Sequence, residues 1–133
     1  MNCLLDTSTL IWSLMQPEKL SRKAWEMIED PSAVKHVSTV SLLEMAIKIS
    51  IGKLRLDGVK IDDLPRLLYE RGAEMIVLEP FETIALQSLP IKENHRDPFD
   101  RLLICQAIER NLTFLSGDEK IKQYRDHGLS LIW

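Results

Sequence analysis

Short apolar runs alternate with longer amphipathic stretches along the chain. Short apolar runs are typical of strands buried in a parallel sheet, whereas apolar positions three and four residues apart predict helices. The runs with strand character lie at residues 2–6, 35–39, 74–79, 112–116 and 129–133. The stretches with helix character lie at residues 7–16, 21–30, 40–51, 61–72, 81–89, 98–110 and 118–128. Because strands and helices alternate, we expect an α/β fold with a central parallel sheet and helices on both faces.

The composition fits one globular domain that spans residues 1–133. The formal net charge of −3 excludes a globally basic nucleic-acid binder but not a local basic patch. Cys3 and Cys105 lie inside apolar runs, so we expect two buried thiols rather than a disulfide. We find no signal peptide pattern and no stretch of the length and hydrophobicity of a membrane span, so the expected location is the cytoplasm.

One helix combines an acidic start with an apolar body. Asp97 and Pro98 are typical of an N-cap followed by the first helical position. Asp100 lies in the first turn, where a carboxylate interacts well with the helix dipole. Helical spacing, however, places Asp100 on the same face as Leu103 and Ile104. We therefore expect Asp100 to point inward, where a charge is costly unless something pairs with it.

Three further acids belong to the same edge of the predicted sheet as Asp100. Asp6 ends the first strand run, Glu44 lies early in the helix after the second run, and Asp118 follows the run at 112–116. In a parallel α/β sheet the carboxyl ends of the strands, and the helices that begin there, meet at one edge. Four carboxylates in a confined site need a cation, and oxygen ligands without a His or Cys cluster favour Mg²⁺ or Mn²⁺.

Each acid also has a purely structural explanation. Asp6 can cap the helix that follows it. Glu44 can close a capping box with Ser41 or pair with Lys48 one turn further on. Asp118 lies in the first turn of a segment with capping-box spacing. These alternatives stay open for each residue alone, although all of them must hold together at one edge of the sheet.

Four segments occur in the order and at the spacing of PIN-domain ribonucleases. They read LLDTSTLIW, VSTVSLLEMAIKISIGKLRL, HRDPFDRLLICQA and FLSGD, and they begin at residues 4, 37, 95 and 114. Over essentially its whole length the chain resembles toxins of the VapC type from type II toxin–antitoxin pairs. The resemblance implies a compact α/β/α sandwich and a metal-dependent endoribonuclease that inhibits translation or growth. It also implies a cognate antitoxin protein, an RNA substrate and a homodimer.

The resemblance assigns roles to individual residues. It implies that four acids bind Mg²⁺ or Mn²⁺ and hydrolyse RNA with a metal-activated water: Asp6, Glu44, Asp100 and Asp118. Asp97 becomes a further candidate ligand beside its role as N-cap. Thr7 and Ser116 are candidate supporting hydroxyls, and Ser116 stands where the family more often has threonine.

Basic residues near the acids are candidates for phosphate contacts with RNA: Arg96, Arg101 and Lys48. The alternative is that they are solvated helix and loop charges. We interpret His95 as a loop residue rather than a metal ligand. Trp12, Trp25 and Trp133 lie in apolar patterns and are expected in the core or at an interface, and the segments around Trp12 and Trp25 are candidates for a dimer or antitoxin surface.

Three other classes of protein also place acids at such an edge. A phosphatase of the haloacid dehalogenase type needs a second acid two residues after the first, where this chain has Ser8. A receiver domain needs an acceptor aspartate at the end of a central strand, and the runs at 35–39 and 74–79 supply none. A binding module without catalysis, whose acids are only helix caps, predicts that Asp6→Asn is tolerated and that metal does not stabilise the protein.

Overall fold

The computed structural model describes all 133 residues, and its centre is a five-stranded sheet. The strands are β1 (Asn2–Leu5), β2 (Val34–Ser38), β3 (Ala73–Ile76), β4 (Thr113–Leu115) and β5 (Ser130–Ile132). All neighbouring strands pair in parallel, in the order β3-β2-β1-β4-β5. The first strand of the chain is therefore the central strand of the sheet, and the prediction of a parallel sheet is confirmed.

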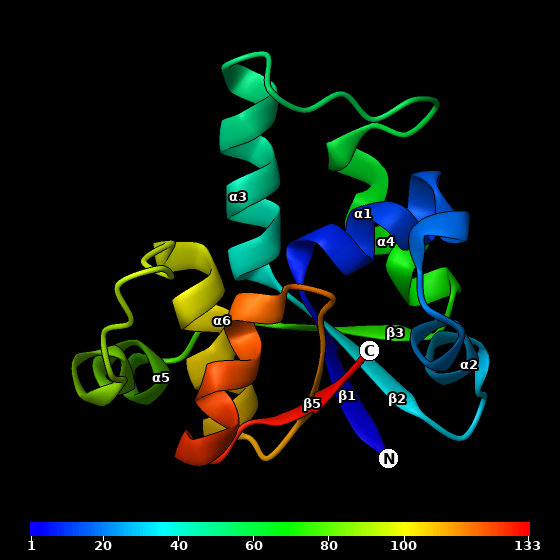
Figure 1. Cartoon of the computed structure of the whole chain (residues 1–133). Helices are drawn as coiled ribbons and strands as arrows, with labels where there is room; N and C mark the ends of the chain where they lie inside the picture. The colour runs from blue at the N-terminus through cyan, green and yellow to red at the C-terminus, as the bar shows by residue number, and fades with distance from the viewer.

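Helices cover both faces of this sheet (Figure 1). The α-helices are α1 (Thr7–Met15), α2 (Arg22–Glu29), α3 (Thr39–Ser50), α4 (Leu64–Glu70), α5 (Pro80–Ala85) and α6 (Pro98–Glu109). The 3₁₀ helices are η1 (Pro17–Lys19), η2 (Ile61–Asp63), η3 (Leu86–Ser88) and η4 (Glu119–His127). Helices α1, α2 and α4 lie on one side of the sheet and α5, α6 and η4 on the other, while α3 rises from the edge between them.

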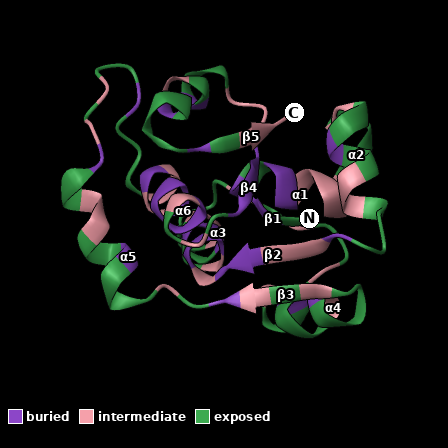
Figure 2. Ribbon diagram, turned by 90° about the horizontal axis from the view of Figure 1, so that it is seen from below, coloured by how far each residue is buried: buried purple, intermediate pink, exposed green.

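Buried side chains form two hydrophobic cores, one on each face of the sheet. Side chains alternate along β1, so Leu4 enters one core while Cys3 and Leu5 enter the other. The first core includes residues of α6 and η4, and the second includes residues of α1 and α4. Figure 2 shows the buried residues concentrated on the inner strands and α6, with the outer helices largely exposed. The expected α/β/α sandwich is confirmed.

Several helix ends differ from the prediction in detail. The N-cap of α3 is Ser38, whose hydroxyl accepts a hydrogen bond from the Val40 N–H at 3.0 Å. Ser41 lies inside the helix, so the predicted capping box between Ser41 and Glu44 is wrong. The third strand ends at Ile76 rather than at residue 79, because Glu79 already caps α5. The helix predicted at 118–128 is the 3₁₀ helix η4.

The expectation of two buried thiols is confirmed, but none of the three tryptophans lies in the buried core. Cys3 and Cys105 are buried free thiols. The rings of Trp12 and Trp133 pack against each other with centroids 5.8 Å apart, whereas Trp25 is 42% exposed. The longest α-helices, α3 and α6, have 12 residues each, and no helix has the length and hydrophobicity of a membrane span.

Candidate metal centre

Two of the predicted acids follow directly on central strands. Asp6 comes after β1 and is the N-cap of α1, where its Oδ1 atom accepts a hydrogen bond from the Thr9 N–H at 2.6 Å. Asp118 comes three residues after β4 and is the N-cap of η4, with its Oδ1 atom accepting from the Lys120 N–H at 3.0 Å. The capping explanation is thus correct for Asp6, whereas Asp118 is itself the N-cap of η4 rather than a first-turn residue of a capping box that starts at Ser116. As N-caps, both carboxylates lie at the same edge of the sheet.

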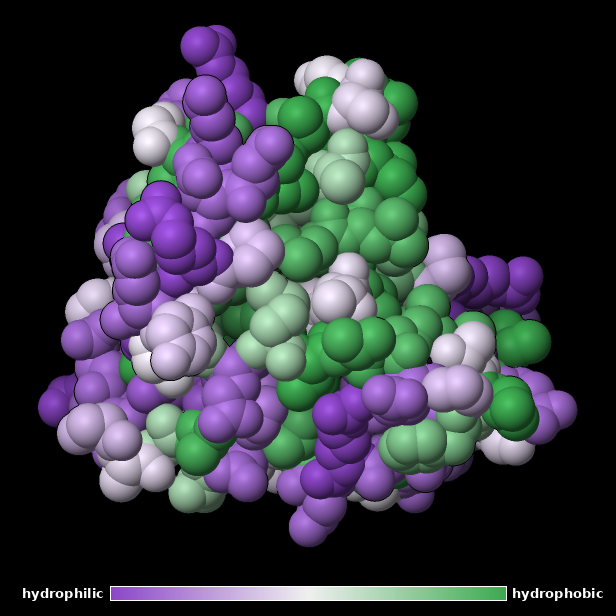
Figure 3. All heavy atoms as spheres, turned by 180° about the vertical axis from the view of Figure 1, so that it is seen from behind, coloured by the Kyte–Doolittle hydropathy of each residue, from purple (hydrophilic) through white to green (hydrophobic).

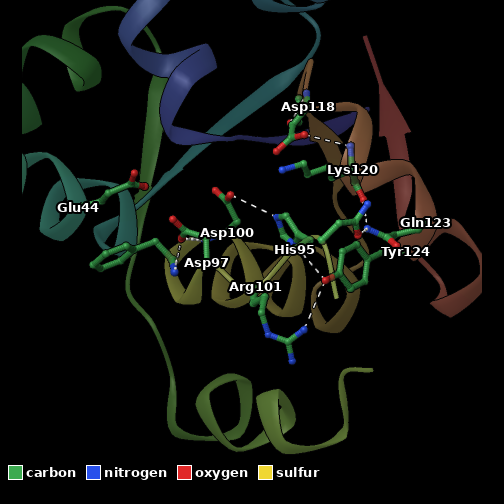
Figure 4. Close-up of polar contacts among 12 residues, drawn as sticks. Glu44, His95, Asp97, Asp100, Arg101, Asp118, Lys120, Gln123 and Tyr124 are labelled. Atoms are coloured by element: carbon green, nitrogen blue, oxygen red, sulfur yellow. Dashed lines mark hydrogen bonds and ion pairs between the residues drawn. The ribbon is translucent and has the colours of Figure 1, made fainter. Parts of the chain in front are cut away.

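Asp100 and Asp118 come together with a histidine at this edge (Figure 4). The Nε2 atom of His95 lies 3.3 Å from Oδ2 of Asp100. One ligand atom from each of His95, Asp100 and Asp118 lies within 4.8 Å of the other two. No other group of three or more His, Cys, Asp or Glu side chains in the chain brings ligand atoms this close. Asp6 and Glu44 are outside this group, although their charges act on Asp100.

Glu44 reaches the site from α3 with one oxygen bound and one free of partners. Glu44 is buried, with only 5% of its surface exposed. The Oε2 atom accepts a hydrogen bond from Lys48 Nζ at 2.6 Å, so the predicted ion pair along α3 is present. The Oε1 atom is buried and has no hydrogen-bond partner. Buried carboxylate oxygens are nearly always satisfied, so this oxygen fits a cation or a bound water.

The acids act on one another electrostatically. Burial, followed by the negative charges of four other acids, raises the pKa of Asp100 to about 7. Those four acids are Asp97, Glu44, Asp6 and Asp118. Burial also raises the pKa of Asp6, together with the charge of Asp118 and against hydrogen bonds from Ser116 and Thr9. The site thus holds more negative charge than its surroundings neutralise, which is the chemistry of a divalent-cation site.

Comparison with protein families identifies the fold around these acids. The PIN domain family model matches residues 3–126, a range that includes all four predicted acids. This chain belongs to the PIN domain family. The family match leaves the phosphatase and receiver-domain alternatives without support.

Solved structures with the same fold come from toxin–antitoxin systems. The PIN domain matches a chain in the crystal structure of VapBC2 from Rickettsia felis bound to a DNA fragment from their promoter, with 19% identity and a TM-score of 0.70 over 99% of this chain and 98% of that chain. It also matches a chain of a toxin–antitoxin complex from Klebsiella pneumoniae, with 16% identity and a TM-score of 0.54 over 98% and 96% of the two chains. Comparison with curated proteins gives no match. At these identities the structural likeness shows the fold alone.

Asp97 begins α6 as predicted. Its Oδ1 atom accepts hydrogen bonds from the N–H groups of Phe99 and Asp100 at 2.9 and 3.1 Å. The residue is exposed at the rim of the site, and its charge contributes to the raised pKa of Asp100. The role of Asp97 as N-cap is therefore confirmed, and a role as metal ligand stays a prediction.

The two predicted supporting hydroxyls have different partners in the PIN domain. Ser116 Oγ accepts a hydrogen bond from the Asp118 N–H at 3.2 Å, and the same hydroxyl counteracts the raised pKa of Asp6. Thr7 Oγ1 instead donates to Ser41 Oγ at 3.1 Å, so it joins α1 to α3 rather than contacting an acid. Of the two, Ser116 has the contacts expected of a supporting group.

The basic residues predicted to contact phosphate also differ in their surroundings. Arg101 is only 8% exposed, and its guanidinium donates to the carbonyls of Leu89 and Pro90 at 3.0 and 2.8 Å. Arg101 was predicted to contact phosphate, but its N–H donors already bind carbonyl oxygens of the chain itself. Arg96 is exposed beside Asp97. Lys120, which the sequence analysis did not include, extends toward the acids from η4 (Figure 4).

His95 is the functional-site residue that sequence reasoning missed. It does lie in a loop, as predicted, but it is only 4% exposed and touches Asp100. Its other ring nitrogen, Nδ1, lies 2.8 Å from the hydroxyl of Tyr124. The five-residue separation between His95 and Asp100 is not a helical spacing, so periodicity carried no signal for this contact.

Proposed function

We propose that this PIN domain is a divalent-metal-dependent endoribonuclease with four catalytic acids: Asp6, Glu44, Asp100 and Asp118. The observation that carries the proposal is that Asp100 and Asp118 bring carboxylate oxygens within 4.8 Å of each other, where burial and the charges of Asp6 and Glu44 also act to raise the pKa of Asp100. The buried oxygen of Glu44 without a partner supports the same reading. Such a cluster is costly unless a cation binds to it.

The donor set fits Mg²⁺ or Mn²⁺. Asp100 and Asp118 bring carboxylate oxygens within 4.8 Å of each other, with Asp6 and Glu44 as further ligands and Asp97 as a further candidate at the rim. A divalent ion held there lowers the pKa of a bound water and stabilises the charge that develops on the phosphate. Glu44 supplies a buried hydrogen-bond acceptor that can orient the attacking water. The N–H of Thr9 fixes the carboxylate of Asp6, and the N–H of Lys120 fixes that of Asp118.

The RNA backbone requires positive charge beside these acids. Lys48 lies on α3 and pairs with Glu44. The Glu44 side chain is buried, whereas the Lys48 side chain is 45% exposed. Arg96 and Lys120 are exposed, and Lys120 extends toward the acids from η4 (Figure 4). Contacts from such side chains to phosphate oxygens hold RNA in register without reading its sequence, so we propose these three as the phosphate-binding residues.

We further propose that the protein is a VapC-type toxin that acts in the cytoplasm, inhibits translation or growth, and binds a protein antitoxin. The similar folds from toxin–antitoxin complexes support this proposal. A pocket of about 330 Å³ between α1, α2 and the sheet offers an apolar site for a partner side chain, with Leu14, Trp25 and Ile28 in its wall. The exposed part of Trp25 lies at a candidate antitoxin or dimer face.

A homodimer is part of the same proposal. Hydrophobic residues gather in a band on the back of the molecule (Figure 3). Leu43, Ile47 and Ile51 are each at least 40% exposed along one face of α3, and Phe81 and Ile84 are more than half exposed on α5. Exposed apolar surface of this extent is typical of a protein–protein interface. Sedimentation analysis of wild type beside Ile47→Glu tests whether this band forms the dimer.

The direct test is cleavage of total RNA by purified protein with Mn²⁺ or Mg²⁺. We expect cutting that EDTA abolishes and that Asp100→Asn reduces by at least about 100-fold, because one ligand carboxylate is lost. Circular dichroism shows whether the variant is folded, and Glu109→Gln, on the exposed end of α6, is the matched control.

The opposite result favours a binding module without catalysis. In that case wild type, freed of any antitoxin, neither cuts RNA nor binds Mn²⁺ in a calorimetric titration, and Asp6→Asn is harmless. Cutting that survives both EDTA and Asp100→Asn would point to a contaminating nuclease and remove the support for this site.

A further inference from the structure

We propose that His95 is a positioning residue that donates a hydrogen bond from Nε2–H to Asp100, and that Tyr124 and Arg101 hold its imidazole in that tautomer. This inference rests on the proposed nuclease function, because it assigns the orientation of one catalytic carboxylate. It concerns three side chains that the proposed chemistry does not use directly, and all three are buried.

The three side chains form a continuous polar chain through the core (Figure 4). Arg101 Nη1 donates to the Tyr124 hydroxyl at 3.4 Å. The Tyr124 hydroxyl lies 2.8 Å from His95 Nδ1, and His95 Nε2 lies 3.3 Å from Asp100 Oδ2. Arg101 comes from α6, Tyr124 from η4 and His95 from the loop that precedes α6. The chain of contacts therefore joins three segments behind a single site carboxylate.

Donor and acceptor rules fix the direction of this chain. A guanidinium can only donate, so the Tyr124 oxygen accepts from Arg101. The hydroxyl proton of Tyr124 then needs an acceptor, because Tyr124 is fully buried. The available acceptor is His95 Nδ1, and a neutral imidazole that accepts at Nδ1 carries its proton on Nε2. That proton faces Asp100.

The opposite tautomer is unfavourable for two reasons. It would leave the buried hydroxyl proton of Tyr124 without an acceptor. It would also direct the lone pair of Nε2 at a carboxylate oxygen of Asp100, where two acceptors repel. Although His95 offers a ring nitrogen within 4.8 Å of ligand atoms of Asp100 and Asp118, a protonated Nε2 cannot bind a metal. The geometry thus gives His95 a place beside the metal ligands rather than among them.

Arg101 also fixes the loop that carries His95. Its guanidinium donates to the carbonyls of Leu89 and Pro90 at the start of this loop. The loop then closes on itself where the N–H of His95 donates to the Lys92 carbonyl at 3.1 Å. One buried guanidinium on α6 therefore sets both the path of the loop and the tautomer of its histidine. Such support behind a ligand fixes its orientation.

Nitrogen-15 NMR of the metal-free protein tests the tautomer without any catalysis. We expect His95 as the Nε2–H form in wild type. His36 is an internal reference with a protonated Nδ1, because its Nδ1 lies 3.0 Å from the Cys3 carbonyl and a carbonyl oxygen can only accept. Its Nε2 faces Glu74 Oε2 at 3.5 Å. In Tyr124→Phe we expect the His95 signals to move away from the pure Nε2–H form while those of His36 stay. His95 as the Nδ1–H form in wild type overturns the proposal.

Two substitutions at His95 test the effect on the site. Glutamine can place an amide N–H where Nε2–H stands, whereas the shorter asparagine cannot reach Asp100. We expect His95→Asn to weaken Mn²⁺ binding by about 10-fold and to lower kcat by about 10- to 100-fold with the KM for RNA nearly unchanged. We expect His95→Gln to restore both to within about 3-fold of wild type.

The outcomes separate this proposal from the function it rests on. If wild type binds Mn²⁺ but cuts no RNA, the nuclease proposal fails, and the tautomer and the Mn²⁺ affinities still decide the role of His95. If Gln and Asn weaken Mn²⁺ binding equally, the imidazole itself is a ligand and the positioning role is overturned. If His95→Asn binds Mn²⁺ and cuts RNA like wild type, His95 has no role at the site.

Discussion

Two regions of this PIN domain bury carboxylates in opposite ways. On α5, Glu82 is fully buried and is surrounded by donors, namely the guanidinium of Arg110, the amide of Gln106 and the N–H of Glu79. Burial alone would raise its pKa, but these hydrogen bonds hold the pKa of Glu82 below its usual value. At the candidate metal centre, burial and neighbouring acids raise the pKa of Asp100 instead.

The difference separates a structural carboxylate from one kept ready for a cation. Glu82 has its counter-charge and its donors within the fold, so nothing further needs to bind there. Glu44 keeps a buried oxygen without a partner, and Asp100 has acids on several sides. Carboxylates that are buried and not neutralised destabilise a fold until a cation binds to them. Their presence here therefore points to a role other than stabilising the fold.

The largest effect is expected at the neutralised acid. Arg110→Met leaves the buried charge of Glu82 without its partner, and we expect a loss of about 3 kcal/mol or more in the free energy of unfolding. Urea denaturation measures it. Arg22→Met is the control, since the ion pair of Arg22 with Glu26 is exposed and contributes little. A loss at Arg110 as small as that at Arg22 would mean that Glu82 does not depend on its partner.

Replacing a carboxylate by its amide should have opposite signs in the two regions. In EDTA at pH 8, Asp100→Asn removes a charge that is buried among other negative charges, so we expect stabilisation by about 1–2 kcal/mol. Glu82→Gln removes a charge that Arg110 needs, so we expect destabilisation of similar size. Urea midpoints of the two variants and wild type give both values. Equal signs would show that the two acids are not different in kind.

The gain from Asp100→Asn should depend on pH. A raised folded-state pKa means that folded Asp100 keeps its proton between its ordinary pKa and about 7, where the unfolded chain has lost it. Ionisation therefore lowers stability as pH rises through this window, by at most about 1.4 kcal/mol per pH unit. We expect the difference between variant and wild type to vanish near pH 4 and to be complete above pH 7.

The stability of Asp100→Asn must be compared with that of wild type at each pH, because His95 changes stability with pH in the opposite direction to Asp100. Burial lowers the pKa of His95, so its contribution to stability rises with pH below its ordinary value. Burial, the largest cause of that shift, acts in both proteins, so at His95 the variant differs from wild type through the contact with Asp100. If Asp100→Asn differs from wild type in stability by the same amount at pH 4.5 and at pH 8, the raised pKa of Asp100 is contradicted.

The smallest effect is expected at Lys48. Its ammonium pairs with Glu44 but is about half exposed, so we expect Lys48→Met to lower the free energy of unfolding by less than about 1 kcal/mol. Calorimetry should show that Mn²⁺ binding is retained, because Glu44 stays in place. If Lys48→Met is as harmful as Arg110→Met, Lys48 is a built-in counter-ion and the two regions are alike.

The sequence predicted the parts of this molecule that depend on local pattern. Apolar runs located all five strands, and the topology of a parallel sheet placed Asp6 and Asp118 at one edge. The inward side of Asp100 followed from its helical spacing to Leu103 and Ile104. The end of β3 was predicted too late because Val77 and Leu78 continue the apolar run after strand pairing stops.

Contacts that join distant segments were not predictable in this way. Nothing in the spacing of Arg101 and Tyr124 shows that they meet, 23 residues apart. Arg101 was therefore assigned to RNA although its guanidinium is buried. The partner of Glu82 and the contact of His95 with Asp100 were hidden for the same reason, since each depends on how loops and helices pack rather than on either segment alone.

The position of β1 has a consequence for how the protein is made. This strand pairs with β2 on one side and with β4 on the other, so that Cys3 lies opposite Thr113. Pairing across so many residues is slow and must wait until the later strand exists. A growing chain carries Asp6 and Glu44 long before it carries Asp118. The order of the strands thus delays assembly of the acidic site until β4 and Asp118 have left the ribosome.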